Sequence, residues 1–382
     1  MTGVAKAFLV LIAVGPPVVS AQGIDRVALG FGVDTTSAAW SDAYWHPAVP
    51  EIYREWSTYL RVGRNTEAGR EHWSAIDRTW PVYDMSASIG SYGAGFAATV
   101  LDIRPADPES TDEFVVKTLI ARVVGAQQEI RPVVLTRVYA RRENGRWVFT
   151  NALTRDTSDW PRATVGPITY LVSPTRVFDR ARAERLVAFA DSMSVAFGVP
   201  PLPELTYYVA DSSDEIHRVM GVEWTFGSFG SAYGSAGNSM ILSGNPVFGE
   251  ENRHEIMHVL LGPIMAEGRA PPMVQEGVAS WLGGSQGMTF DQFMRRYAVY
   301  LRQNPDVTVD TVLSGSTVDR GWYPTGALLV SMIHERGGFS AVRDLLTSGR
   351  SVDELRSAVS RLLGSDWEEV VTELRRRALE FG

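Results

Sequence analysis

Two histidines four residues apart restrict the local fold of this chain more than any other feature. The run His254-Glu255-Ile256-Met257-His258 reads H-E-x-x-H. Side chains at positions i and i+4 lie one above the other when the backbone is helical, and both imidazoles then reach the same metal ion. Glu255 lies beside that face, within reach of a water bound to the metal. The alternative is a solvated helix that carries two unrelated histidines.

The segment around the motif has the start, interior and end of a short, mostly buried helix. Glu250 and Glu251 precede the motif, and acidic side chains favour the positive end of a helix. Apolar residues at 256–257 and 259–261 supply a packing surface, and Gly262-Pro263 is a stop signal. We therefore predict a helix that ends at Gly262-Pro263.

A third candidate ligand, Glu276, lies in the next predicted helix, where Pro272 fits the first turn and Gly283-Gly284 closes the end. Its neighbours are mostly apolar, and burying a lone charge is costly, so a metal ion would be a suitable partner. Catalytic zinc commonly takes three protein ligands and leaves one position for water. A plain helix-surface glutamate is the alternative, and Glu267, in the expected connecting loop, is a rival ligand.

The two motifs together resemble those of the gluzincin metallopeptidases, of the peptidase MA-like branch, over roughly residues 165–380. The second motif is the run Glu276-Gly277-Val278-Ala279-Ser280-Trp281. The resemblance implies that His254, His258 and Glu276 bind Zn²⁺ and that Glu255 is the general base. Thermolysin-type enzymes often carry an acid four residues after the third ligand, where it orients a histidine. This chain has Ser280 there, so that role must fall to another group.

The resemblance also implies a hydrogen-bond donor for the oxyanion that forms when water attacks the peptide carbonyl. Tyr323 comes first in Tyr323-Pro324-Thr325-Gly326, before a helix predicted over residues 323–335, as a comparable tyrosine does in peptidase MA-like chains. The alternative is a core tyrosine with its hydroxyl at the surface.

Residues 224–242 are rich in glycine, serine and aromatic residues, and predict either an antiparallel edge strand that pairs with an extended substrate or a surface loop.

Composition limits the class of protein that this chain can be and its cellular location. The chain has 382 residues, of which 45% are hydrophobic, and a net charge of −8, so it can bury more than one core and is not expected to bind nucleic acid. Cysteine is absent, which excludes disulfides and cysteine ligands. Lys6, the apolar residues 7–19 and the small residues 19–21 predict a signal peptide over residues 1–21 rather than a membrane anchor. We expect a secreted or periplasmic protein of a bacterial envelope, without an integral membrane segment after cleavage.

The rest of the chain predicts an α+β fold with an accessory domain over residues 22–160 and a metallopeptidase-like domain over 165–382. Residues 34–80 look helical, and strand-like runs follow at 93–103, 114–123, 133–142 and 146–153, with a hairpin turn at Asn144-Gly145. Helices followed by an antiparallel meander are similar to the nuclear-transport-factor-like cone fold. The second domain is predicted as a small sheet, with strands at 168–172 and 205–209, the motif helix and a mainly helical C-terminal lobe.

These features predict a secreted zinc-dependent peptidase that acts on peptide or protein substrates. Endopeptidase action is favoured because the chain lacks an exopeptidase run such as Gly-x-Met-Glu-Asn. The other four histidines, His46, His72, His217 and His334, are expected to be structural or exposed. Two other functions stay open: a non-catalytic, zinc-containing envelope protein, and a ligand-binding protein that acts through its N-terminal domain.

Overall fold

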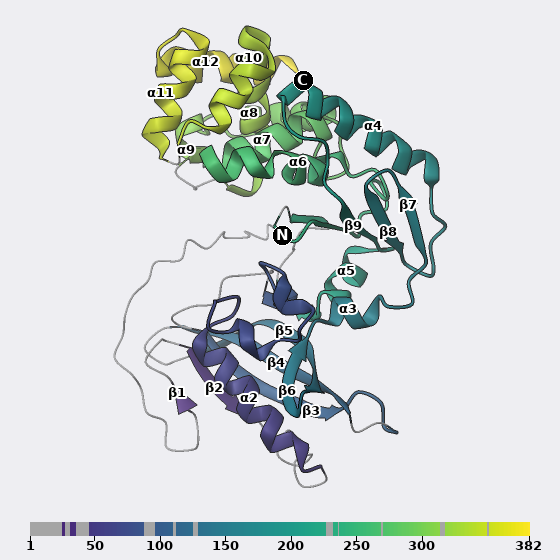
Figure 1. Ribbon diagram of the computed structural model, residues 1–382. Helices are drawn as coiled ribbons and strands as arrows, with labels where there is room; N and C mark the ends of the chain where they lie inside the picture. The colour runs from purple at the N-terminus through teal and green to yellow at the C-terminus, as the bar shows by residue number, and fades with distance from the viewer. Residues whose placement is uncertain are drawn as a thin grey trace. The chain divides into compact units, whose positions relative to one another are not determined.

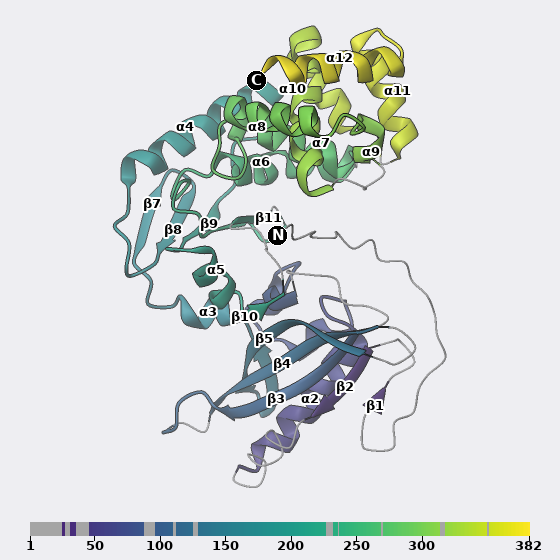
Figure 2. The same ribbon diagram turned by 180° about the vertical axis from the view of Figure 1, so that it is seen from behind.

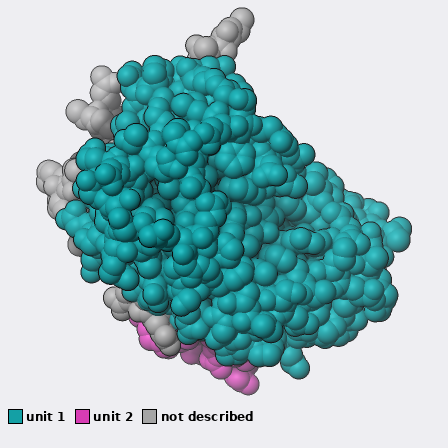
Figure 3. Space-filling model, turned by 90° about the horizontal axis from the view of Figure 1, so that it is seen from above, with its two compact units in different colours: residues 1–10, 161–211, 232–382 teal, residues 11–160, 212–231 magenta. Residues whose placement is uncertain are grey.

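The computed structural model divides the chain into two compact units. The residues it describes are 25–26, 31–35, 46–87, 96–109, 112–124, 129–226, 232–235, 237–268, 270–313, 318–349 and 351–382. Unit 1 comprises residues 161–211 and 232–382, and unit 2 comprises the described residues up to 160 together with 212–226; Figure 3 gives them separate colours. The expected signal peptide, residues 1–21, lies outside the described residues, as do Trp40 and Trp45.

Unit 2 contains a seven-stranded sheet in the order β1-β2-β3-β4-β5-β10, with β6 also paired to β5. Its pairings are antiparallel except for the parallel pair β2–β3. The strands are β1 Asp25–Arg26, β2 Phe31–Thr35, β3 Phe96–Pro105, β4 Glu113–Val124, β5 Glu129–Glu143, β6 Arg146–Thr150 and β10 Val222–Thr225.

The predicted meander is confirmed over β3 to β6, with one correction at its end. Asn144 and Gly145 both have positive φ, 51° and 80°, as a two-residue type I′ hairpin requires. The last strand, expected to reach residue 153, ends at Thr150, and α3 (Ala152–Asp156) follows it. Ala152 and Leu153 are buried on that helix, so the apolar run that indicated strand is buried as a helical turn instead.

The expectation of helix over residues 34–80 is wrong for most of the described part of that range, 34–35 and 46–80. Residues 34–35 belong to β2, and the described α-helix is α2, Ala48–Val62. It ends where Gly63 takes a φ of 98°, a conformation that glycine adopts without strain. Short 3₁₀ turns follow at Arg70–His72, Asp77–Thr79 and Met85–Ala87.

Helix α2 covers one face of the unit 2 sheet, in front of it in Figure 1 and behind it in Figure 2. Its residues Ile52, Trp56, Tyr59 and Leu60 are buried at the helical spacing of one face. The Trp56 ring packs edge-on against Phe149 of β6, with ring centroids 4.7 Å apart. Its indole N–H also donates to the Thr118 hydroxyl of β4 at 2.8 Å, so the buried polar atom is satisfied. Trp56 is therefore a packing residue of the unit 2 core.

Unit 1 begins with a five-stranded sheet in the order β11-β12-β9-β8-β7. Its strands are β7 Arg162–Val165, β8 Ile168–Val172, β9 Leu205–Val209, β11 Ala232–Ser235 and β12 Met240–Ser243. The inner pairs β8–β9 and β9–β12 are parallel, whereas both edge strands pair antiparallel. The strands predicted at 168–172 and 205–209 are confirmed, and an antiparallel edge strand rather than a loop forms at 232–235.

The remaining described elements are helices. In unit 1, α4 links β8 to β9, and the other helices form the C-terminal lobe. Helix α5, capped by the Ser212 hydroxyl, belongs to unit 2. Their bounds are α4 Arg180–Phe197, α5 Ser213–Val219, α6 Arg253–Gly268, α7 Pro272–Gly283, α8 Phe290–Gln303, α9 Val309–Leu313, α10 Val318–Leu346, α11 Val352–Leu363 and α12 Trp367–Glu380.

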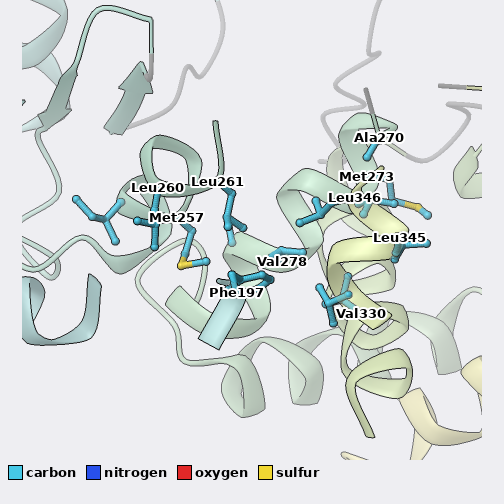
Figure 4. Packing of buried hydrophobic residues seen from close by; sticks show 14 of the residues in the cluster. Phe197, Met257, Leu260, Leu261, Ala270, Met273, Val278, Val330, Leu345 and Leu346 are labelled. Carbon is cyan, nitrogen blue, oxygen red and sulfur yellow. The ribbon is translucent and has the colours of Figure 1, made fainter. Parts of the chain in front are cut away.

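Helix α6 does not stop at Gly262-Pro263, so that prediction is wrong. A proline inside a helix removes one backbone hydrogen bond and costs about 3 kcal/mol. Leu260, Leu261 and Ile264 flank the proline and are almost completely buried. Each such side chain contributes about 1.5–3 kcal/mol on burial, enough in sum to offset the proline. Figure 4 shows this core, where side chains of α4, α6, α7 and α10 meet.

Helix α10 starts earlier than predicted. The helix expected over 323–335 is part of one run, Val318–Leu346, which is interrupted at Gly338, whose φ of 66° and ψ of −166° are not helical. Tyr323 therefore lies in the second turn of a helix and not ahead of one.

The predicted α+β class is confirmed. Within the described residues, no helix combines the length and apolarity that crossing a bilayer requires.

Candidate metal centre

The first two turns of α6 hold the two motif histidines on one face. Asn252 begins the helix, because its side-chain oxygen accepts the backbone N–H of Glu255 at 3.2 Å. His254 is 7% exposed, and its ring centroid lies 5.0 Å from that of His258 one turn later. Ile256, on the opposite side, and Met257 are buried in the core of unit 1. Both histidine rings therefore lie on one helix face, as the spacing predicts.

Helix α7 brings Glu276 to the same place because glycines let it approach its neighbours closely. A Cβ on Gly283 would lie 2.4 Å from the backbone nitrogen of His254, so no other residue fits between the end of α7 and the start of α6. A Cβ on Gly277 would lie 2.5 Å from the carbonyl carbon of Gly326 in α10. The Glu276-Gly277 pair therefore sits where three helices are nearest to one another.

Three potential ligand atoms converge at this point. The Nε2 atoms of His254 and His258 are 3.3 Å apart. Glu276 Oε2 lies 3.1 Å from the first and 3.4 Å from the second. The two imidazoles and the carboxylate form a group of possible metal ligands, identified in a search of the described residues.

The electrostatics of the group are set by this short spacing. Burial would raise the pKa of Glu276, but hydrogen bonds and charge interactions with the two imidazoles outweigh it and lower the pKa to about 2. Burial likewise opposes a charged His254, yet the hydrogen bond to Glu276 and the nearby carboxylates raise the pKa of that imidazole. The carboxylate thus stabilises a positive charge on His254, and the imidazoles stabilise the ionised form of Glu276.

The group that orients His254 is a backbone carbonyl. The His254 Nδ1 lies 2.8 Å from the carbonyl oxygen of Gly284, which can only accept, so Nδ1 carries a hydrogen and, in the neutral imidazole, Nε2 has the lone pair. Gly284 adopts a φ of 78° at the end of α7. Sequence reasoning missed this partner because a carbonyl has no side-chain signature. Ser280, at the position of the absent acid, is completely buried.

Glu255 lies against the edge strand β11. A Cβ on Gly234 of that strand would stand 2.9 Å from Glu255 Oε2 and 2.9 Å from the Glu255 carbonyl oxygen. The absence of a side chain at Gly234 therefore lets the strand run directly past the carboxylate. Strand β11 is at the end of the sheet order, paired to β12 along one side.

Tyr323 reaches the group from α10. Its ring centroid lies 6.2 Å from that of His254. Burial raises the pKa of the Tyr323 phenol well above its usual range, and the Glu276 and Glu255 carboxylates raise it further, so the hydroxyl stays protonated at neutral pH. Close packing positions the helix, since a Cβ on Gly326 would lie 2.1 Å from the Met273 carbonyl oxygen.

The rival ligand Glu267 and the other histidines have different settings. The backbone of Glu267 belongs to the last turn of α6, so the predicted loop location is wrong; its side chain lies outside the described part. His72 pairs with Glu55 at 2.7 Å and is buried, and His334 packs edge-on against Phe339 with centroids 4.5 Å apart. These two histidines therefore have structural surroundings.

Comparison with known proteins gives distant matches among solved structures. A scan against protein families finds no match, and a search of curated proteins finds none. An M1 zinc metallopeptidase from Deinococcus radiodurans, a mutant bound to a Tyr-Ser-Ala substrate, is 14% identical with a TM-score of 0.34, over 73% of this chain and 62% of that one. The same peptidase in another structure is 13% identical with a TM-score of 0.33, over 74% and 63%. The chain thus spans less than two thirds of the length of these structures.

Proposed function

We propose that this protein is a zinc-dependent peptidase in which His254, His258 and Glu276 hold the metal. One observation carries the proposal: the separations of 3.1, 3.3 and 3.4 Å among their three ligand atoms. Zinc bonds of about 2.0–2.1 Å at tetrahedral angles put neighbouring ligand atoms about 3.3–3.4 Å apart. The three atoms therefore match one face of a zinc tetrahedron, with the fourth corner available to water.

The protonation pattern supports a cation at the centre of this face. Because the His254 Nδ1–H points to Gly284, its Nε2 lone pair faces the Glu276 carboxylate at 3.1 Å. Two acceptors at this distance repel unless a proton or a metal ion lies between them. Zinc satisfies all three acceptors at once, whereas a single proton bridges two. The donor set, two imidazoles and one carboxylate, is also one that catalytic zinc uses.

The residues around the site supply acid–base and electrostatic chemistry. Bound zinc would lower the pKa of a water and polarise the scissile carbonyl. Glu255, alongside the ligand group, would accept the proton of the attacking water and pass it to the leaving amine. The Tyr323 hydroxyl, which stays protonated, would donate to the oxyanion.

An extended peptide is the substrate class that the surroundings favour. Strand β11 ends the sheet and runs past Glu255 at the side-chain-free position Gly234. A peptide that added to this edge by backbone hydrogen bonds would bring its carbonyl groups next to the Glu255 carboxylate. Endopeptidase action, export and the cone-like fold of residues 22–160 remain predictions from the sequence.

Glu255→Gln separates metal binding from hydrolysis. We expect the variant to keep its zinc, since Glu255 is not a proposed ligand, and to lose about 10²–10⁴-fold in kcat, the range for a general base. Zinc is measured by mass spectrometry of the metal and hydrolysis with a quenched-peptide mixture, with Glu184→Gln, an exposed glutamate on α4, as the control. Full activity in Glu255→Gln would remove the proposed base. Absence of chelator-sensitive cleavage in the unmodified protein would favour the non-catalytic zinc protein.

The ligand-binding alternative has a cavity in unit 2 in its favour. It measures about 1420 Å³ and is lined by residues that include Arg137, Arg155 and Trp160. Its arginines are already paired, however: Arg137 with Asp156 at 2.7 Å, and Arg155 with Glu113 at 2.8 Å. Because these charges are satisfied within the chain, we place the function at the metal centre.

A further inference from the structure

Unit 1 also contains a cavity, and one of its lining residues, Tyr323, belongs to the candidate metal centre. It measures about 250 Å³ and lies between the loop after α7, helix α8 and the start of α10. Tyr323 lines it, and the ring of the same residue lies 6.2 Å from the His254 ring. Gln286 lines it as well, two residues after the Gly284 carbonyl that orients His254. A substrate group bound in this cavity would therefore lie next to a peptide bond bound at the metal centre.

The cavity has an aromatic interior and a cationic rim. Phe293 and Tyr297 are buried, and the Tyr297 hydroxyl is bonded to the Thr325 hydroxyl at 2.7 Å, so its polar end is already satisfied. Tyr300 adds a further ring. Arg296, one turn before Tyr300 on α8, is exposed to solvent and is the charged member among the described lining residues.

The Arg296 guanidinium is available for a ligand. It forms no ion pair with any carboxylate in the described part of the chain. Elsewhere in the lobe, Arg376 and Arg377 of α12 are both paired with Glu373. The side-chain amides of Gln286 and Gln303 add further donors to the lining.

We propose that this cavity is a specificity subsite that binds a carboxylate of the substrate residue next to the scissile bond. The inference rests on the proposed peptidase function. A planar guanidinium binds a carboxylate through two parallel hydrogen bonds, and the aromatic rings accommodate the methylenes that carry it. The carboxylate comes either from an aspartate or glutamate side chain or from the free C-terminus of the substrate.

Charge reversal at the rim tests the proposal. The zinc-loaded protein and its Arg296→Glu and Arg295→Glu variants would each be given a peptide mixture randomised around one bond, with free or amidated C-termini. Arg295 is the matched control because it is adjacent on α8 and exposed but does not line the cavity. Cleavage products would be sequenced by mass spectrometry, and the zinc content of each protein measured.

We expect the unmodified protein and Arg295→Glu to prefer an acidic residue at one fixed position beside the cleaved bond by about fivefold, as for a partly exposed ion pair. Arg296→Glu should invert the preference to lysine or arginine at that position. If the free C-terminus is the source, the preference instead follows the unblocked peptides and disappears in Arg296→Glu. Zinc-dependent cleavage with the same preference in both variants would overturn the subsite and leave the proposed function intact.

A binding measurement keeps the proposal testable if no peptide is cleaved. Saturation-transfer NMR of N-acetylglutamate methylamide with the metal-free protein should show contact that Arg295→Glu retains and Arg296→Glu loses. Equal signals in both variants, or none in the unmodified protein, would overturn the subsite. Failure of cleavage together with a signal that depends on Arg296 would instead reject the peptidase function alone.

Discussion

Two buried carboxylates of unit 2 and the half-buried Glu276 of unit 1 have different kinds of partner. In unit 2, Asp84 accepts hydrogen bonds from Arg64 at 2.7 Å and from the Tyr59 hydroxyl at 2.8 Å. Asp77 similarly accepts from hydroxyl groups and from the backbone N–H of Asn151 at 3.1 Å. In unit 1, Glu276 faces two imidazole nitrogens, one of which is left as an acceptor by its bond to Gly284.

This difference separates a structural acid from a candidate ligand. Donors around Asp77 and Asp84 compensate their lost hydration within the chain, so each holds irregular backbone in place without further atoms. Glu276 faces the Nε2 of His254, which donates only when that imidazole is protonated; when His254 is neutral, a metal cation is needed between these two acceptors. Exposure differs as well, since the Glu276 side chain is 26% exposed and Asp77 and Asp84 are fully buried, but the donor or acceptor character of their partners is what separates their roles.

Removing the Glu276 carboxylate is the strongest way to break the comparison. Glu276→Ala should weaken zinc binding by more than about 100-fold, since loss of a mere outer partner of a ligand costs about 10–100-fold, and should abolish hydrolysis. Metal analysis after dialysis measures this. Gln275→Ala, next to it on α7 and bonded to the Ala270 carbonyl, is the control. Unchanged zinc stoichiometry would move the third ligand to Glu267 or elsewhere.

The corresponding change in unit 2 should affect stability and spare the metal. Asp84→Asn leaves the buried Arg64 guanidinium without its anion, and breaking such a pair costs about 3–5 kcal/mol in free energy of unfolding. Denaturant unfolding measures the loss, with the highly exposed Asp353→Asn as the control. Loss of zinc in folded Asp84→Asn, with stability unaltered, would contradict the division of roles.

The pH dependence sharpens the comparison with a smaller effect. In the metal-free protein the lowered pKa of Glu276 stabilises the fold above about pH 4.3, and this contribution is lost as pH falls toward 2. The raised pKa of His254 stabilises the fold below about pH 6.5, and this contribution is lost as pH rises through the folded-state value. Zinc requires neutral imidazoles, so the rise in Tm on adding zinc should grow by several degrees from pH 5.5 to 7.5. Differential scanning fluorimetry tests this, and a zinc effect that shrinks over that range would argue against imidazole ligands.

Predictions from local patterns succeeded where one short segment contains the whole physical cause. Asn144-Gly145 supplies both positive φ angles of its turn, as expected. The spacing of His254 and His258 likewise places both rings on one helix face. Predictions failed at Pro263, where burial against other helices outweighs a local stop signal, and over residues 34–80, where buried aspartates stabilise irregular backbone.

The motif spacing alone indicates which residues offer metal-binding atoms, because H-E-x-x-H spacing and helix geometry are both local. Three relations follow from the folded chain and not from the motif: Glu276 meets the histidines at ligand distances, Gly284 orients His254, and Tyr323 lies beside them. Those relations depend on how closely α7 approaches α6 and α10, which Gly277, Gly283 and Gly326 permit. Close packing between segments far apart in the chain is a property of the folded core, and no pattern within a single helix specifies it.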